Sequence, residues 1–180
     1  RFSPDLFYSQ APPFDKGGLF RGETSSFLSA GRTALKNEKE RKKHLMNEKK
    51  CKVLAAQIRL ETLKVIHSRG FGHVGGSMDL ADLMAVLYGE VMKFDPKNPR
   101  WEDRDWLVLS KGHAGPVAYA TFGIMGFYPM EEAYTLNHPH TRFPSHTDRK
   151  LTPGVDLTTG SLGQGASTAT GAALGNKIDG

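Results

Sequence analysis

The chain has 180 residues, 38% of them hydrophobic and 24% charged, which is enough for one folded domain with a sizeable core. Its single cysteine, Cys51, excludes an internal disulfide and favours a cytoplasmic setting. No apolar run approaches the roughly 18 residues of a membrane span, and the N-terminus lacks a secretory signal pattern, so we expect no membrane partner.

The net charge of +5 is concentrated in residues 36–52, where eight Lys or Arg and three Glu leave a surplus equal to that of the whole chain. A basic run can mark a nucleic-acid site. Here no aromatic residue interleaves the run and no recognition motif follows it. We therefore interpret it as a solvated helix start and expect no nucleic-acid partner.

Residues 1–45 show neither a helical nor a strand period, and we predict a disordered or extended leader there. The patterning changes abruptly at Met46, so we hypothesise that Met46 is the native start and that residues 46–180 form the domain. The chain begins with Arg1 and stops directly after a predicted helix, which indicates a partial chain. An intact mass of the native protein that includes residues 1–45 would contradict the hypothesis of the start.

Two helices are predicted in the first half of this domain. Residues 47–68 are predicted to form an amphipathic helix that ends at Gly70. Its wide apolar face consists of a stripe, Val53, Ala56, Leu60 and Leu63, and of the flanking residues Leu54, Ile58, Val65 and Ile66. After a glycine-rich loop at 70–76, Ser77 is predicted to cap a second helix that runs to about residue 92.

An α/β unit is predicted next. Residues 105–109 read as a buried strand, 110–115 as a glycine turn, and a helix follows from Pro116 to about residue 126. Ligands in parallel α/β folds lie at the carboxyl ends of the strands, where residues 110–113 would be. A short helix at 129–137, a long irregular loop at 138–153 and a last helix at 164–177 complete the pattern.

Residues 156–165, DLTTGSLGQG, place three glycines within six residues directly before the last helix. Glycine lets a ligand approach the backbone closely, and a helix start presents free N–H groups. The loop is therefore predicted to hold a cofactor by its backbone. A tight turn before a closely packed helix of small residues is the alternative.

Three histidines, His73, His113 and His146, lie on loops beside glycine, proline or serine. Histidine can donate hydrogen bonds, bind anions and transfer protons near neutral pH. Other readings stay open at this point. His138 and His140 could join His146 at a zinc ion, although no carboxylate or cysteine completes the spacing; Asp148 and Asp156 could act as bases; Lys111 could bind phosphate.

Four motifs in order resemble the N-terminal part of transketolase, over about residues 47–180. They are residues 72–77 (GHVGGS), 103–113 (DRDWLVLSKGH), 144–146 (PSH) and 158–165 (TTGSLGQG). More narrowly, the chain resembles the split form, in which N-terminal and C-terminal subunits together make one enzyme. Ser161 supports this, since most single-chain transketolases have proline there.

The resemblance implies a thiamine diphosphate-binding fold of the pyrophosphate type: a parallel sheet with helices on both faces, incomplete at its C-terminus. It also implies transfer of a two-carbon ketol unit from a ketose phosphate to an aldose phosphate, with thiamine diphosphate and Mg²⁺ or Ca²⁺. The implied partners are a C-terminal subunit, in a dimer or tetramer, and sugar phosphates.

The resemblance also implies roles for single residues. His73 would assist proton transfer to substrate oxygens, His113 would contact the cofactor diphosphate and face the donor, and His146 would bind the donor hydroxyls. Gly160, Ser161 and Leu162 would touch the cofactor rings. The family's metal ligands and its activating glutamate match nothing in the 180 residues, so we expect the piece alone to be inactive. A deoxyxylulose-phosphate synthase, an E1-type dehydrogenase and a non-catalytic assembly fragment are the alternatives.

Overall fold

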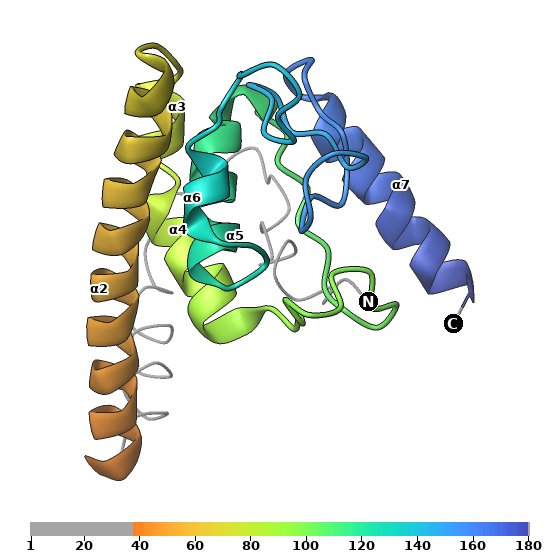
Figure 1. Cartoon of the computed structure of the whole chain (residues 1–180). Helices are drawn as coiled ribbons and strands as arrows, with labels where there is room; N and C mark the ends of the chain where they lie inside the picture. The colour runs from red at the N-terminus through yellow and green to blue at the C-terminus, as the bar shows by residue number, and fades with distance from the viewer. Residues whose placement is uncertain (1–37, 180) are drawn as a thin grey trace, which may run out of the picture. The chain divides into compact units, whose positions relative to one another are not determined.

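A computed structural model describes residues 38–179, with side chains from 47 to 178 (Figure 1). Of the described residues, 50–179 belong to one compact unit and 38–49 to another. Most of the predicted leader, residues 1–37, lies outside the described residues, while 38–45 belong to the first described helix. The start at Met46 stays a prediction.

The long helix α2 spans Glu38–Arg69 and confirms the helix predicted at 47–68, with an earlier beginning. Gly70 follows it with φ +82°, and its N–H reaches the carbonyl oxygens of Ile66 (3.2 Å) and His67 (3.0 Å). A glycine in the left-handed conformation is the usual residue just past a helix C-terminus. The predicted end of the helix is therefore confirmed.

The buried face of α2 is only one part of the predicted wide face, the flank that carries Ile58, Val65 and Ile66. Ala55, Ile58 and Val65 are at most 1% exposed. The predicted stripe is exposed instead, with Val53 at 60%, Leu60 at 54%, Leu63 at 46% and Ala56 also exposed. The apolar residues of this helix cover a wide arc, and a period of 3.6 does not tell which edge of a wide arc meets the core.

The single helix predicted after Ser77 is wrong, because the segment is divided into three. Helix α3 covers Val74–Met78, α4 covers Ala81–Val86, and a π-helical turn, η2, covers Leu87–Val91. Ser77 lies inside α3, where its hydroxyl donates to the carbonyl oxygen of His73 at 2.8 Å. It therefore ties the turn to His73 and does not act as a cap.

A short 3-10 turn, η3 (Gly112–Ala114), leads into helix α5 (Gly115–Ile124), which has Pro116 in its first turn as predicted. Helix α6 (Met130–Ala133) is shorter than the predicted 129–137, and α7 (Gln164–Asp179) matches the last predicted helix. The loop between α6 and α7 is irregular, as predicted. Helix α5 lies at the centre of the core, whose largest fully buried side chains are Tyr119, Phe122, Phe143, Ile58, Met84 and Leu136.

The strand predicted at 105–109 does not form, and residues 38–179 contain no strand at all. A strand needs a neighbouring strand to pair with its backbone. Here side chains take that place in part: the N–H of Leu107 donates to a carboxylate oxygen of Asp156 (2.9 Å), and the hydroxyl of Thr159 donates to the carbonyl oxygen of Leu109 (2.6 Å). The predicted parallel sheet is thus not seen in the described part of the chain.

Polar contacts join α2 to later elements. Arg59 forms an ion pair with Asp82 of α4, and the hydroxyl of Tyr134, just after α6, donates to Glu61. Among residues 38–179, no helix combines the length and the apolar character needed to cross a membrane.

Candidate active site

Three histidines that are far apart in the sequence come together. The ring centroids of His73 and His113 lie 4.9 Å apart with 62° between the ring planes, and those of His73 and His146 lie 6.2 Å apart with 70°. The rings therefore meet edge to face. His73 and His146 are exposed and His113 is half-buried, so this histidine cluster (His73, His113 and His146) is open to a ligand.

The end of α2 and the start of α3 position His73. Gly72 packs so tightly on α2 that an added Cβ would lie 3.1 Å from Cγ2 of Ile66. Immediately afterwards, the carbonyl oxygen of His73 accepts the hydrogen bond from the buried Ser77. The backbone on both sides of the imidazole is thus held against the protein while the ring stays exposed.

His113 lies on η3, where glycines permit close approach. A Cβ on Gly112 would lie 2.4 Å from the carbonyl oxygen of Thr159, and one on Gly76 would lie 3.1 Å from Nε2 of His113. Lys111 contacts both carboxylate oxygens of Asp79, the residue directly after α3, at 2.7 and 2.8 Å. Lys111, which could have bound a phosphate, is therefore paired with a carboxylate.

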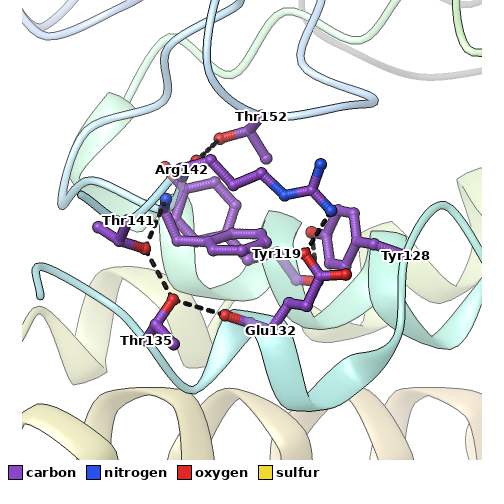
Figure 2. Close-up of polar contacts among 8 residues, drawn as sticks. Tyr119, Tyr128, Glu132, Thr135, Thr141, Arg142 and Thr152 are labelled. Atoms are coloured by element: carbon purple, nitrogen blue, oxygen red, sulfur yellow. Dashed lines mark hydrogen bonds and ion pairs between the residues drawn. The ribbon is translucent and has the colours of Figure 1, made fainter.

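His146 lies in the long loop, which a cluster of polar and aromatic contacts holds to α5 and α6 (Figure 2). Arg142 forms an ion pair with Glu132, and its guanidinium carbon lies 5.6 Å from the ring centre of Tyr128. Closer to the histidine, the hydroxyl of Tyr119 donates to the carbonyl oxygen of Pro144 at 2.7 Å. These contacts bring a loop without regular structure to a defined place beside His73.

The glycine-rich loop borders the same cluster. Thr159 is buried, and its N–H donates to the carbonyl oxygen of Thr147 (3.2 Å). After it, Gly160, Ser161 and Leu162 are exposed, with Leu162 at 69%. A Cβ on Gly160 would lie 3.9 Å from Cδ2 of His146, which is ordinary contact distance. The loop therefore offers an open backbone and an apolar side chain next to the histidines.

The other candidates do not join this cluster. Asp156 forms a buried ion pair with Arg104, and burial raises the pKa of its carboxyl, against the opposing effects of the Leu107 N–H and of Arg104. Asp148 accepts hydrogen bonds from the Lys150 N–H (2.8 Å) and the Thr158 hydroxyl (3.4 Å). Among the described residues, no group of three or more His, Cys, Asp or Glu could hold a metal, His138 and His140 included.

Sequence reasoning missed the residues that hold the loops. Asn137 contacts Ser145 twice, and Lys111 pairs with Asp79. The one available signal was Asn137 itself, because asparagine tolerates the left-handed conformation that it adopts here, φ +55°. Partners many residues apart in an irregular segment leave no period in the sequence.

Three imidazoles that converge beside an exposed glycine-rich loop can donate hydrogen bonds to a polar ligand and exchange protons with it. The model of the thiamine diphosphate-binding domain of transketolase matches residues 50–179, and the chain belongs to this family. The predicted membership is therefore confirmed.

Relatives and solved structures agree. A 6-deoxy-6-sulfo-D-fructose transketolase subunit from a Clostridium strain is 52% identical over 122 residues, which cover 68% of this chain and 44% of that relative. Transketolase 1 of Escherichia coli is 39% identical, over 70% of this chain and 19% of its own length. The structure of transketolase from Leishmania mexicana aligns with a TM-score of 0.66 at 37% identity, over 69% of this chain and 19% of that one.

The chain thus spans less than half the length of these relatives. Its likeness to solved transketolases agrees with the predicted α/β class, although the described residues supply only its helices and loops.

Proposed function

We propose that this chain is the N-terminal part of a thiamine diphosphate-dependent transketolase, which moves a two-carbon ketol unit from a ketose phosphate to an aldose phosphate. The observation that carries the proposal is the convergence of His73, His113 and His146 beside the exposed segment 160–162. Family membership supplies the reaction class. No observation on the described residues favours the alternatives, a deoxyxylulose-phosphate synthase or an E1-type dehydrogenase.

The residues present fit the cofactor. Gly160 is exposed beside the histidines, and a Cβ added there would lie 3.9 Å from Cδ2 of His146, so a flat ring system can approach the backbone of the loop at this point. Leu162, 69% exposed, is an apolar side chain with nothing to cover it in the described chain. We assign Gly160, Ser161 and Leu162 to the cofactor rings and His113 to the diphosphate. When bound, thiamine diphosphate supplies an electron sink for breaking the carbon–carbon bond next to a carbonyl.

The histidines would act on the sugar oxygens. His73 and His146 expose their rings to the same space, 6.2 Å apart, which allows both to reach one substrate. An imidazole at this place can donate a hydrogen bond to a carbonyl oxygen and can accept a hydroxyl proton as the bond breaks. We assign proton transfer to His73 and binding of the donor hydroxyls to His146.

We place the Mg²⁺ or Ca²⁺ ligands outside these 180 residues. Support comes from the cluster itself, whose three side chains are imidazoles, and from the carboxylate beside it, Asp79, which is paired with Lys111. Magnesium and calcium prefer carboxylate and carbonyl oxygens.

The proposed partner is a C-terminal subunit, in a dimeric or tetrameric enzyme of the cytoplasm. The 52% identical relative is named as a subunit, and Ser161 agrees with the split form. That relative's name also favours a second candidate donor, 6-deoxy-6-sulfo-D-fructose, in which a sulfonate replaces the phosphate. A comparison of kcat/KM for this ketose and for fructose 6-phosphate would decide between the donors.

Histidine variants test the proposed roles in the full-length chain combined with its C-terminal partner. His73→Ala should lower kcat by about 100-fold or more, the usual contribution of a positioned acid or base. His146→Ala should lower kcat/KM for the donor, because it removes a contact to the donor hydroxyls. The affinity of both variants for thiamine diphosphate, measured by calorimetry, should change much less. His138→Ala is the matched control, because His138 is an exposed histidine of the same loop. Equal effects in all three variants would contradict the assignment.

A further inference from the structure

The backbone at His146 is held from both sides. Before it, Ser145 donates its N–H to Oδ1 of Asn137 at 2.7 Å. After it, Thr147 donates its N–H to the carbonyl oxygen of Gly112 at 3.4 Å, and its hydroxyl lies 3.0 Å from that of Thr159. The imidazole between them is exposed. Its place relative to His73 therefore depends on these backbone contacts.

Asn137 makes three contacts with the segment that leads to His146. Its Oδ1 accepts from the Ser145 N–H, its Nδ2 donates to the Ser145 hydroxyl, and its own N–H donates to the carbonyl oxygen of Phe143 at 3.0 Å. Phe143 is 1% exposed and belongs to the core. Through its side chain and its backbone, Asn137 thus ties residues 143–145, directly before His146, to the segment that follows α6.

The backbone conformation of Asn137 explains the choice of residue. Its φ of +55° lies in the left-handed region, where asparagine, aspartate and glycine are tolerated best. Of these three, only asparagine has both an acceptor for the Ser145 N–H and a donor for the Ser145 hydroxyl. Asparagine therefore meets the backbone requirement and the hydrogen-bonding requirement together.

We propose that Asn137 is a positioning residue, which acts through Ser145 to set the place of the His146 imidazole opposite His73. Its effect on turnover rests on the proposed function. Its effect on the geometry of the loop does not, because the contacts stand on the structure alone. A displacement of about 1 Å in a reacting group can cost about 100-fold in rate.

Asn137→Gly separates the hydrogen bonds from the backbone. Glycine accepts the positive φ and removes both side-chain bonds. In the reconstituted full-length enzyme we expect kcat/KM for the donor to fall by about 10- to 100-fold, with unchanged affinity for thiamine diphosphate. Asn137→Asp keeps an acceptor for the Ser145 N–H and should restore most of the activity. Ser145→Ala, which removes only the hydroxyl contact, should give an intermediate loss.

His140→Gly is the matched control, because His140 lies in the same loop with φ +61° and an exposed side chain. It should leave kcat/KM within about twofold of the wild type. A loss as large as that of Asn137→Gly would show that any left-handed residue of the loop matters, and would overturn the proposal.

A double-mutant cycle tests whether Asn137 acts through His146. In the His146→Ala background, Asn137→Gly should cause no further loss of kcat/KM, because the side chain that it positions is gone. A full, additive loss would mean that Asn137 acts by another route.

Two readouts stay valid if the enzyme shows no ketol transfer, so that the proposed function and the positioning role can fail separately. In Asn137→Gly, hydrogen exchange at the Ser145 amide should become faster, and the NMR resonance of the His146 imidazole should shift. If neither the exchange rate of the Ser145 amide nor the resonance of the His146 imidazole changed, the positioning role would be overturned, whatever the activity.

Discussion

Glycine at position 112 is required by the carbonyl oxygen of Thr159. An added Cβ would lie 2.4 Å from that oxygen, which is a backbone atom and cannot rotate away. We expect Gly112→Ala to lower the free energy of unfolding by about 1–3 kcal/mol, the usual cost of overpacking. Urea denaturation of the full-length chain would measure it.

Gly171 supplies the matched control. It lies within α7, and a Cβ added there meets nothing within 4 Å. Gly171→Ala should raise the free energy of unfolding by about 0.5–1 kcal/mol, because alanine loses less conformational entropy in a helix. If both variants were equally stable, the glycine-rich loop would not lie against η3 as described.

The hydroxyl of Tyr134 should lose its proton at a higher pH than that of an ordinary tyrosine. Its hydrogen bond to the Glu61 carboxylate, with some burial, raises its pKa to about 12. The bond joins the neutral phenol to the ionised carboxylate of Glu61, so its contribution to stability is complete from neutral pH up to about 10, the ordinary pKa of tyrosine, and is lost as the pH rises towards 12. Ultraviolet titration of the wild type against Tyr134→Phe isolates this group; a phenol that titrates near pH 10 would contradict the contact.

The buried ion pair of Arg104 and Asp156 supports the segment 105–109 where no strand lies beside it in the described chain. The two side chains are 9% and 5% exposed, and Asp156 also accepts the N–H of Leu107. Arg104→Met leaves the carboxylate buried without its partner, a change that costs about 3–5 kcal/mol in typical cases. We expect a loss of this order at neutral pH, measured by urea denaturation.

The pH dependence of that loss has a definite sign. Burial already raises the pKa of Asp156 in the folded state, and removing Arg104 raises it further. A raised pKa favours the folded state when the carboxyl is protonated, so the deficit of Arg104→Met should shrink as the pH falls towards about 4. Arg59→Met is the control: its ion pair with Asp82 is exposed, and its loss should change stability little at any pH.

A further prediction follows from the different burial of two apolar residues of α2. Ile58 is 0% exposed and Leu60 is 54% exposed. Ile58→Ala should lower the free energy of unfolding by about 2–5 kcal/mol, because it leaves a cavity, while Leu60→Ala should cost under about 1 kcal/mol. Thermal denaturation compares them directly. The reverse order would mean that the stripe of the predicted face, and not its flank, is packed against the core.

Helix α2 also shows the limit of sequence reasoning about elements. Its period and its terminal Gly70 predicted a helix and its end correctly, because both are local properties of the chain. The face that it buries depends on α4 and on the segment after α6, through contacts such as Arg59 with Asp82. The strand predicted from the apolar run 105–109 does not form, because a strand must pair with a neighbour that the described part of the chain does not provide.

The histidine cluster is where sequence and structure agree most closely. His73, His113 and His146 were predicted to share a site, and the ring centroid of His73 lies 4.9 Å from that of His113 and 6.2 Å from that of His146. Their motifs carry glycines and prolines, which mark loops in any sequence. These loops are held by Asn137, Lys111 and Arg142. Each of them contacts a residue at least eight positions away in the sequence, and no sequence pattern predicts such a contact.

The complete enzyme, in this account, needs more than these residues: the chain spans 44% of the sulfofructose transketolase subunit and 19% of Escherichia coli transketolase 1. The described part supplies the histidines and an open loop for the cofactor rings. Oxygen ligands for the metal and a C-terminal subunit would complete the site. Each subunit alone should therefore be inactive.

Ketol transfer by the reconstituted pair is the most direct test. The full-length chain and its C-terminal partner are mixed with thiamine diphosphate and Mg²⁺, and a ketose phosphate labelled with ¹³C in its first two carbons is added with an unlabelled aldose phosphate. We predict that both labelled carbons move together to the acceptor, only when both subunits and the cofactor are present. A complete, folded pair that leaves the label in the donor would contradict the account.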